Sequence, residues 1–216
     1  MEKSYRNISY LFVGVLLLVF VGFYKTYFSL FPRFIGINPL LHIHATLIIA
    51  WFGMLIVQPI LIRNKQFALH RRLGKASYWL MGLLVLAIIL VVRNMQLREK
   101  NLAVFAFAFS DVSFLLLVYG LAIYYRHKSA FHARYMVMTV LPFLNPALGR
   151  LPDSPVPGPV LGLLILLGLL VFEWFKTKVF RPYLIGIVSF ISIYAFYGLM
   201  TPTPAWDRFW GLFFGR

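Results

Sequence analysis

The chain has 216 residues, of which 61% are hydrophobic and only 12% are charged, whereas a water-soluble domain has about a quarter of its residues charged. The net charge of +15 does not predict a nucleic-acid partner, because the basic residues stand at the ends of apolar blocks, where they meet anionic lipid headgroups. The absence of cysteine excludes disulfides, thiolate metal sites and iron–sulfur clusters.

Apolar segments close to the length of a bilayer crossing follow one another along the chain. Lipid offers the backbone no hydrogen-bond partners, and barrel strands would alternate in polarity, so long unbroken apolar runs predict helices. The sequence therefore predicts a single transmembrane domain over residues 1–216, an all-α polytopic bundle of about seven helices. The predicted helices cover residues 8–24, 39–62, 76–92, 102–125, 131–151, 160–175 and 183–200.

The fifth segment differs from the others because Pro142, Asn145 and Pro146 lie inside it. It is predicted either as a kinked crossing or as a broken, re-entrant segment. If it does not cross, the segments after it have the opposite orientation.

The orientation follows from the distribution of basic residues. With the N-terminus inside, 13 of the 21 Lys and Arg residues lie on the inner side, chiefly in the connections 63–75 and 126–134. We expect a bacterial-type cytoplasmic membrane with anionic headgroups as the environment. The tail, residues 201–216, is rich in Trp, Phe and Arg and is predicted to lie at the membrane interface.

A polar pocket is predicted in the outer half of the bundle. His42 and His44 stand near the start of the second helix, and on a regular helix they point about 200° apart. His44 shares a helix face with Trp51 and Gln58 and is expected to point inward. His42 is placed at headgroup level and becomes a further metal ligand only if the helix start is unwound. A packing contact for these histidines is the alternative.

Asp111 is the carboxylate predicted inside the membrane, at the depth of His44. The outer ends of the fifth segment bring Asn145 and Arg150 to the same depth. His44 and Asp111 are candidate metal ligands, Asn145 a hydrogen-bond donor and Arg150 a charge partner. The alternative is a structural pair of Asp111 with Arg150 or a hydrogen bond to Asn145.

A second candidate site is predicted at the inner face. It combines His70, His132, Arg134 and Glu173, with the two histidines and the glutamate as ligands. A haem between two histidines needs them on facing helices at one depth, which only His70 and His132 approach, and His70 is predicted in a loop that ends at Gly74. The alternative is that both basic loops simply lie on anionic lipid.

The run LHIHATLIIAWFGMLIVQPILIRNKQFALHRRLGKASYWL, with its HxH and HRxLG motifs, and the later HARYM and NPALGRL resemble small bacterial multi-pass membrane proteins of unknown function. The resemblance covers about residues 28–151 and implies a bacterial membrane location but no assigned activity. A looser similarity to membrane haem proteins and membrane zinc hydrolases exists, but the HxxxH of the hydrolases is missing.

Three functions follow as hypotheses. The first is a metal- or haem-binding redox or assembly protein, with Zn, Cu, Fe or haem as the cofactor. The second is a proton-coupled small-molecule transporter in which His44 and Asp111 relay protons. The third is a non-catalytic membrane scaffold, a homo-oligomer or a subunit of a partner membrane protein. The sequence contains no Ser–His–Asp arrangement on one helix face, so it does not predict hydrolytic catalysis of that type.

Overall fold

The computed structural model describes residue 5 and residues 7–99, 102–151 and 157–214, and this part of the chain is helical, without strands. The all-α class predicted from the sequence is therefore confirmed. The elements are α1 (Ile8–Gly22), the 3-10 turn η2 (Phe28–Leu30), α2 (Pro39–Arg63), α3 (Phe67–Glu99), α4 (Leu102–Tyr124), α5 (Ser129–Met138), the 3-10 turn η3 (Leu141–Phe143), α6 (Leu144–Leu148), α7 (Gly158–Lys176), α8 (Arg181–Met200) and α9 (Pro204–Phe214).

Within the described residues, five helices are long and apolar enough to cross a bilayer. These candidate crossings are Pro39–Arg63, Phe67–Met95, Phe105–Tyr124, Gly158–Lys176 and Arg181–Met200. α1 is apolar but has 15 residues, which gives a length of about 22 Å against about 30 Å of hydrocarbon. A membrane-spanning bundle is supported, and the predicted total of seven crossings depends on α1 and on the fifth segment.

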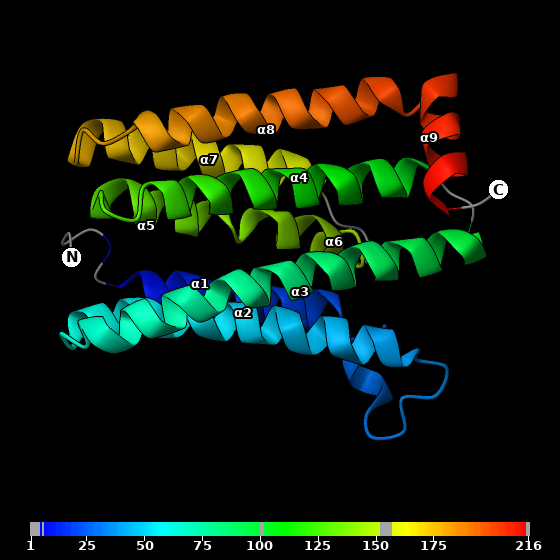
Figure 1. Ribbon diagram of the computed structural model, residues 1–216, viewed down its shortest axis with the longest axis horizontal. Helices are drawn as coiled ribbons and strands as arrows, with labels where there is room; N and C mark the ends of the chain where they lie inside the picture. Colours follow the sequence, from blue (N-terminus) through cyan, green and yellow to red (C-terminus); the bar gives the residue numbers. More distant parts are fainter. Residues whose placement is uncertain (1–4, 6, 100–101, 152–156, 215–216) are drawn as a thin grey trace.

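The helices lie side by side along the long axis of the molecule (Figure 1). The start of α1, the α2–α3 turn, the α4–α5 turn and the α7–α8 turn gather at one end of the bundle, whereas the α1–α2 connection and α9 lie toward the other. The basic connections predicted to share one side are thus at the same end, which is called the basic end below. That this end faces the cytoplasm stays a prediction.

The fifth predicted segment is broken into α5, η3 and α6. Proline has no N–H to donate, so Pro142 cannot bond the carbonyl group one turn before it. The backbone tightens instead: Thr139 N–H donates to the Met136 carbonyl at 3.3 Å, and Val140 N–H to the Val137 carbonyl at 3.4 Å. The Thr139 hydroxyl also donates to the Met136 carbonyl. The interruption predicted from the two prolines is confirmed.

α6 packs against the far end of α1. Gly22 is the last residue of α1 and is buried. A Cβ atom at Gly22 would lie 2.4 Å from the carbonyl oxygen of Ala147, so the two backbones touch there. Since α5 begins at the basic end and α6 reaches the last residue of α1, the broken segment runs the full length of α1 (Figure 1).

Gly22→Val is expected to destabilise the bundle by about 1–3 kcal/mol, because the added side chain forces the α1 and α6 backbones apart. Gly14→Ala in the same helix is the matched control, since nothing lies within 4 Å of a Cβ atom at that position. Reversible unfolding of both variants in detergent measures the difference. Equal stability of the two would contradict the close contact between α1 and α6.

The third helix begins nine residues earlier than the predicted start at residue 76, at Phe67. The turn before it is tight: Lys65 has a left-handed backbone with φ of 59°, and Gln66 N–H donates to the Leu61 carbonyl at 2.8 Å. The stretch after it has no proline and contains Ala, Leu, Arg and Lys, which favour helix. The predicted loop around His70 is therefore wrong, and Gly74 lies inside α3 rather than at the end of a turn.

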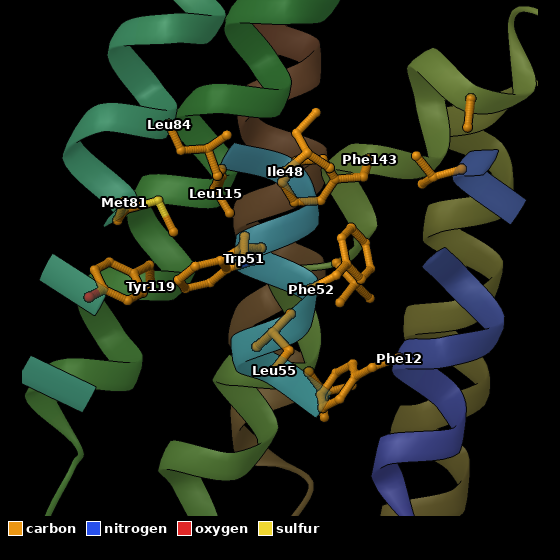
Figure 2. Close-up of a cluster of buried hydrophobic side chains, with 14 of the residues drawn as sticks. Phe12, Ile48, Trp51, Phe52, Leu55, Met81, Leu84, Leu115, Tyr119 and Phe143 are labelled. Atoms are coloured by element: carbon orange, nitrogen blue, oxygen red, sulfur yellow. The ribbon is translucent and has the colours of Figure 1, made fainter. Parts of the chain in front are cut away.

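The centre of the bundle is an apolar core shared by α1, α2, α3, α4 and η3 (Figure 2). Trp51 and Phe52 of α2 are fully buried in it. The Trp51 ring meets the Tyr119 ring edge-on with centroids 5.5 Å apart, and Phe52 packs on Phe143 at 5.4 Å. The core separates the polar groups at the basic end from those at the opposite end.

α9 lies across the end of the bundle, crosswise to the other helices (Figure 1). Trp206 anchors it and is buried among Phe105, Phe109 and Tyr197. This arrangement agrees with the predicted interfacial tail, whose position at the bilayer surface stays a prediction.

Candidate functional site

The predicted outer pocket divides into separate groups. His42 lies in an aromatic contact at the α1–α2 connection, where its Nδ1 is 2.7 Å from the Tyr27 hydroxyl and its ring is 4.8 Å from that of Phe34. Its role is thus to hold this connection on α2. Within the described residues, His42 and His44 share no hydrogen bond and no ring contact, as expected for side chains two positions apart on a regular helix.

His44 points into the bundle, and its Nδ1 is buried without a hydrogen-bond partner in the described structure. Arg150 is its neighbouring charge. The Arg150 guanidinium donates to the Pro146 carbonyl at 2.7 Å and lies 4.3 Å from the centre of the Phe23 ring. Arg150 therefore caps α6 and packs on α1, and its positive charge makes the surroundings of His44 unfavourable for a metal cation.

Asp111 is buried between α4, α6 and α8. Its carboxylate accepts hydrogen bonds from the Asn145 amide at 3.1 Å and from the Tyr194 hydroxyl. The structure thus brings Asp111 and Asn145 together, but the third member of the group is Tyr194, which the sequence interpretation did not include. These hydrogen bonds satisfy the carboxylate without Arg150 and without His44.

The structure gives no support for the predicted metal site of His44, Asp111 and His42. Among the described residues there is no group of three or more His, Asp or Glu side chains placed to hold a metal ion. Trp51 belongs to the apolar core and Gln58 to the basic end, although both lie on the predicted face of α2. Residues on one face of a helix can lie at very different depths in the bundle, so Trp51 and Gln58 belong to different sites.

A buried ion pair lies at the basic end. The Arg134 Nη2 atom is 2.6 Å from the Glu173 Oε2 atom, and both side chains are fully buried. Thr177 donates its hydroxyl to Glu173 as well. The Arg134 Nη1 atom also donates to the Ala130 carbonyl at 2.8 Å, and its guanidinium lies over the ring of Tyr5 at 4.8 Å.

Tyr5 ties the residues before α1 to this ion pair. Its hydroxyl donates to Glu173 and is 2.9 Å from the Tyr183 hydroxyl. Burial, together with the neighbouring Tyr183 and Glu173, raises the pKa of the Tyr5 hydroxyl far above its usual value, so it stays a donor. Tyr5 and Tyr183 were not predicted, because nothing in a single sequence indicates which tyrosine reaches a carboxylate on another helix.

Glu173 is therefore not placed as a ligand beside the two histidines. Its carboxylate accepts from Arg134, Tyr5 and Thr177, and these donors direct it toward α5 and toward Tyr5 before α1. The four residues of the predicted inner site, His70, His132, Arg134 and Glu173, form two separate groups. Arg134 and Glu173 form the ion pair, and His70 and His132 form a pair of imidazoles. The groups lie on different sides of α5, because Arg134 and His132 are two positions apart on that helix.

A cavity of about 560 Å³ opens at the basic end between α1, α2, α3 and α5. His70 and His132 both line it, and their ring centroids are 6.5 Å apart. Its walls are mainly apolar, with Phe12, Leu55 and Met136 among them. The cations that line it are Arg71, Lys75 and Arg126, which are exposed, and none of the described lining residues is acidic.

The two imidazoles differ in their hydrogen bonds. His132 Nδ1 is 2.8 Å from the carbonyl oxygen of Ala122, which can only accept, so Nδ1 is the donor and the neutral ring has its lone pair on Nε2. His70 Nδ1 and the neighbouring Gln58 Oε1 are buried without a partner in the described structure. The cavity is therefore lined by one imidazole whose Nδ1 is bonded to a main-chain carbonyl and by a second whose Nδ1 is unsatisfied.

No family model matches the chain, and no curated protein and no solved structure shows significant similarity to it. The resemblance to small bacterial membrane proteins with HxH and HRxLG motifs thus stays a prediction. The fold and the site define an all-helical membrane bundle with a basic, histidine-bearing cavity at one end, and its function is argued from that cavity.

Proposed function

We propose that this chain is a haem protein of a bacterial cytoplasmic membrane, in which His70 and His132 would hold a non-covalently bound haem. The spacing of the two rings carries the proposal. Two metal–imidazole bonds of about 2 Å, with about 1 Å from each nitrogen to its ring centre, separate axial imidazoles by about 6 Å. The observed separation of the ring centroids is 6.5 Å.

Two histidines are enough to bind a haem iron, although they are too few for a free metal ion. The porphyrin supplies four nitrogens to its iron, so only two axial positions are left for side chains. A free Zn or Cu ion at this place would need further His, Asp or Glu ligands, but none of the described lining residues is acidic, and Glu173 is held by Arg134. The proposal thus retains the haem of the sequence hypothesis and sets aside the metal-ion sites.

The hydrogen bond of His132 supports the same ligand. Histidines that bind metals usually donate their second ring N–H to a backbone carbonyl or a carboxylate, which fixes the tautomer and raises the basicity of the ligating nitrogen. The contact of His132 Nδ1 with the Ala122 carbonyl is of this kind. Because Ala122 lies in α4 and His132 in α5, the α4–α5 turn fixes the direction of Nε2.

The other residues that line the cavity suit the porphyrin ring and the propionate groups of a haem. The apolar walls accept the porphyrin face, and Arg71, Lys75 and Arg126 at the opening can pair with its two propionate groups. Since the chain has no cysteine, a covalent c-type attachment is excluded. The orientation with propionates toward the basic end places them at the predicted cytoplasmic surface.

A haem held by His70 and His132 would supply one-electron redox chemistry. Because two protein side chains would hold it, this arrangement would favour electron transfer over the binding of a gas or a substrate. The chain's own residues would hold the iron ligands, exclude water with apolar walls and neutralise the propionates. We place the chain as a one-electron carrier that exchanges electrons with a partner at the basic end.

The test is haem binding by the full-length chain. It is produced in bacterial membranes with added haem precursor, purified in detergent, and examined by absorption spectroscopy before and after reduction by dithionite. We expect haem stoichiometric with the chain, a low-spin spectrum in both oxidation states, and release of unmodified haem b into acidified solvent. A purified, folded chain that takes up no haem, even when hemin is added, contradicts the proposal.

A further inference from the structure

We propose that the hollow where α1 and α6 meet, toward the end of the bundle opposite the basic end, binds one anionic phospholipid: Lys25 and Arg150 hold its phosphate group, and the apolar lining holds an acyl chain. The hollow has a volume of about 550 Å³, and its lining includes both cations together with Phe20, Val21, Phe28 and Leu151. This volume lies within the range of about 300–1,000 Å³ that is usual for ligand pockets. The hollow is separate from the cavity that His70 and His132 line, so the inference does not depend on haem.

The depth of the hollow matches the outer edge of the hydrocarbon. α1 begins at the basic end (Figure 1), and its 15 residues reach about 22 Å along the bundle, about 8 Å less than a hydrocarbon core of about 30 Å. Gly22 is the last residue of α1 and lines the hollow. The hollow therefore lies just inside the hydrocarbon edge, where the acyl chains of a lipid join its headgroup.

The Arg150 guanidinium is held at this place by two contacts. It donates to the Pro146 carbonyl at 2.7 Å and lies 4.3 Å from the centre of the Phe23 ring. A guanidinium presents its five N–H donors in a planar fork that matches two oxygens of one phosphate. The two contacts fix the direction of that fork before a lipid arrives.

Lys25 supplies the second positive charge, and its side chain is exposed at the rim of the hollow. Main-chain hydrogen bonds hold the turn around it: Tyr27 N–H donates to the Phe23 carbonyl at 2.9 Å, and Ser29 N–H donates to the Tyr24 carbonyl at 2.8 Å. None of the described lining residues is acidic, so they attract an anion. Because the rest of the lining is mainly apolar, a phosphate that carries an acyl chain fits better than a free phosphate ion.

The connection that contains Lys25 has a surface suited to lipid. The side chains of Tyr24, Phe31 and Ile35 are each more than half exposed. Aromatic side chains are enriched where the headgroups meet the hydrocarbon, whereas exposed apolar groups gathered in water are unfavourable. The hollow therefore opens beside lipid, which makes a phospholipid the anion within its reach.

The experiment measures lipid binding to the full-length chain in detergent by native mass spectrometry. Phosphatidylglycerol is the anionic lipid, phosphatidylcholine is the lipid without net charge, and inorganic phosphate in excess tests whether the phosphate group alone competes. Thermal unfolding with each lipid is the second readout, because a ligand that binds the folded chain stabilises it.

The test variants are Lys25→Gln, which removes one charge, and Val21→Trp, which fills the apolar part of the hollow from an exposed position. Arg33→Gln is the matched control, because Arg33 is exposed in the same connection and is not among the lining residues. Arg150→Gln removes the other charge. If Arg150→Gln does not fold, because Arg150 also caps α6, Lys25→Gln decides.

The wild type is expected to bind one phosphatidylglycerol at least about 5-fold more tightly than phosphatidylcholine, and excess inorganic phosphate should not displace it. Lys25→Gln should weaken phosphatidylglycerol binding by about 5-fold, as expected for one cation near a lipid phosphate. Val21→Trp should weaken the binding of both lipids. Arg33→Gln should match the wild type, and only lipids that bind should raise the melting temperature.

Equal affinity for the two lipids overturns the inference, because the two cations then have no role in recognition. Displacement by inorganic phosphate also overturns it, since it shows a general anion site. Equal weakening by Lys25→Gln and Arg33→Gln has the same consequence, because it shows only a general attraction between the surface and anionic lipid.

Discussion

Replacing His132 by alanine is expected to abolish the low-spin haem spectrum. The change removes the ligand whose tautomer the Ala122 carbonyl fixes, and a haem with one remaining axial imidazole is five-coordinate and bound more weakly. His70→Ala should have the same effect, since the His70 ring lies 6.5 Å from the His132 ring, centroid to centroid. The measurements are the haem-to-protein ratio and the absorption spectrum in both oxidation states.

Two additions separate loss of a ligand from loss of fold. Free imidazole should restore the low-spin spectrum of His132→Ala, because it fits the space that the side chain leaves. His132→Met should keep two axial ligands and raise the midpoint potential. His127→Ala is the matched control within the cavity lining, and His42→Ala is the control at the opposite end. A low-spin spectrum that survives in both His132→Ala and His70→Ala would rule out the proposed pair.

Glu173→Ala is expected to destabilise the bundle by about 3–5 kcal/mol, because it leaves the charge of Arg134 buried without its counter-ion. Arg134→Ala should cost less, since a carboxyl group can take up a proton whereas a guanidinium in a protein cannot lose one. The double variant Arg134→Met with Glu173→Leu should be more stable than the sum of the single changes indicates. Unfolding in detergent measures all three.

Lys176→Ala is the control for the ion pair, because Lys176 lies on the same turn of α7 and is exposed. Its removal should change the stability by less than about 0.5 kcal/mol. Strict additivity of the Arg134 and Glu173 changes would show that the two side chains do not stabilise each other. Haem content serves as a second readout, and it should be unaffected in every variant that folds, since the ion pair and the imidazoles are separate sites.

The sequence predicted those features that depend on composition and local pattern. The long apolar runs required helices, because only a helix satisfies its own backbone in lipid. Pro142 and Pro146 predicted the break between α5 and α6, since a missing N–H acts within one turn. The gathering of the basic connections at one end followed from the number of residues in each segment and from the distribution of Lys and Arg.

The start of α3 shows where local pattern failed. The charged stretch from His70 to Lys75 was interpreted as a loop because a membrane crossing needs apolar residues, but a helix can extend beyond the hydrocarbon when its residues favour helix. The earlier start of α3 determines the candidate site, because it fixes the position of His70. With His70 in a loop its direction is undetermined, whereas in α3 its ring lies beside that of His132, with centroids 6.5 Å apart.

The partners of the charged residues could not be predicted, because they depend on which helices are neighbours. Asp111 was predicted beside His44 from an assumed common depth, but its contacts are with Asn145 and Tyr194. Glu173 was predicted beside the histidines and instead pairs with Arg134. Depth along a helix follows from residue number, whereas rotation and adjacency follow from side-chain packing between segments far apart in the chain.

The sequence by itself therefore determined the membrane class, most of the helical segments, the break in the fifth segment and the residue types available for chemistry. Only the tertiary structure decided that His70 and His132 meet in a basic cavity, that Gln58 lies beside them, and that Glu173 and Asp111 have other partners. The physical reason is that helix formation is local in the sequence, whereas a site needs particular faces of particular helices to pack together.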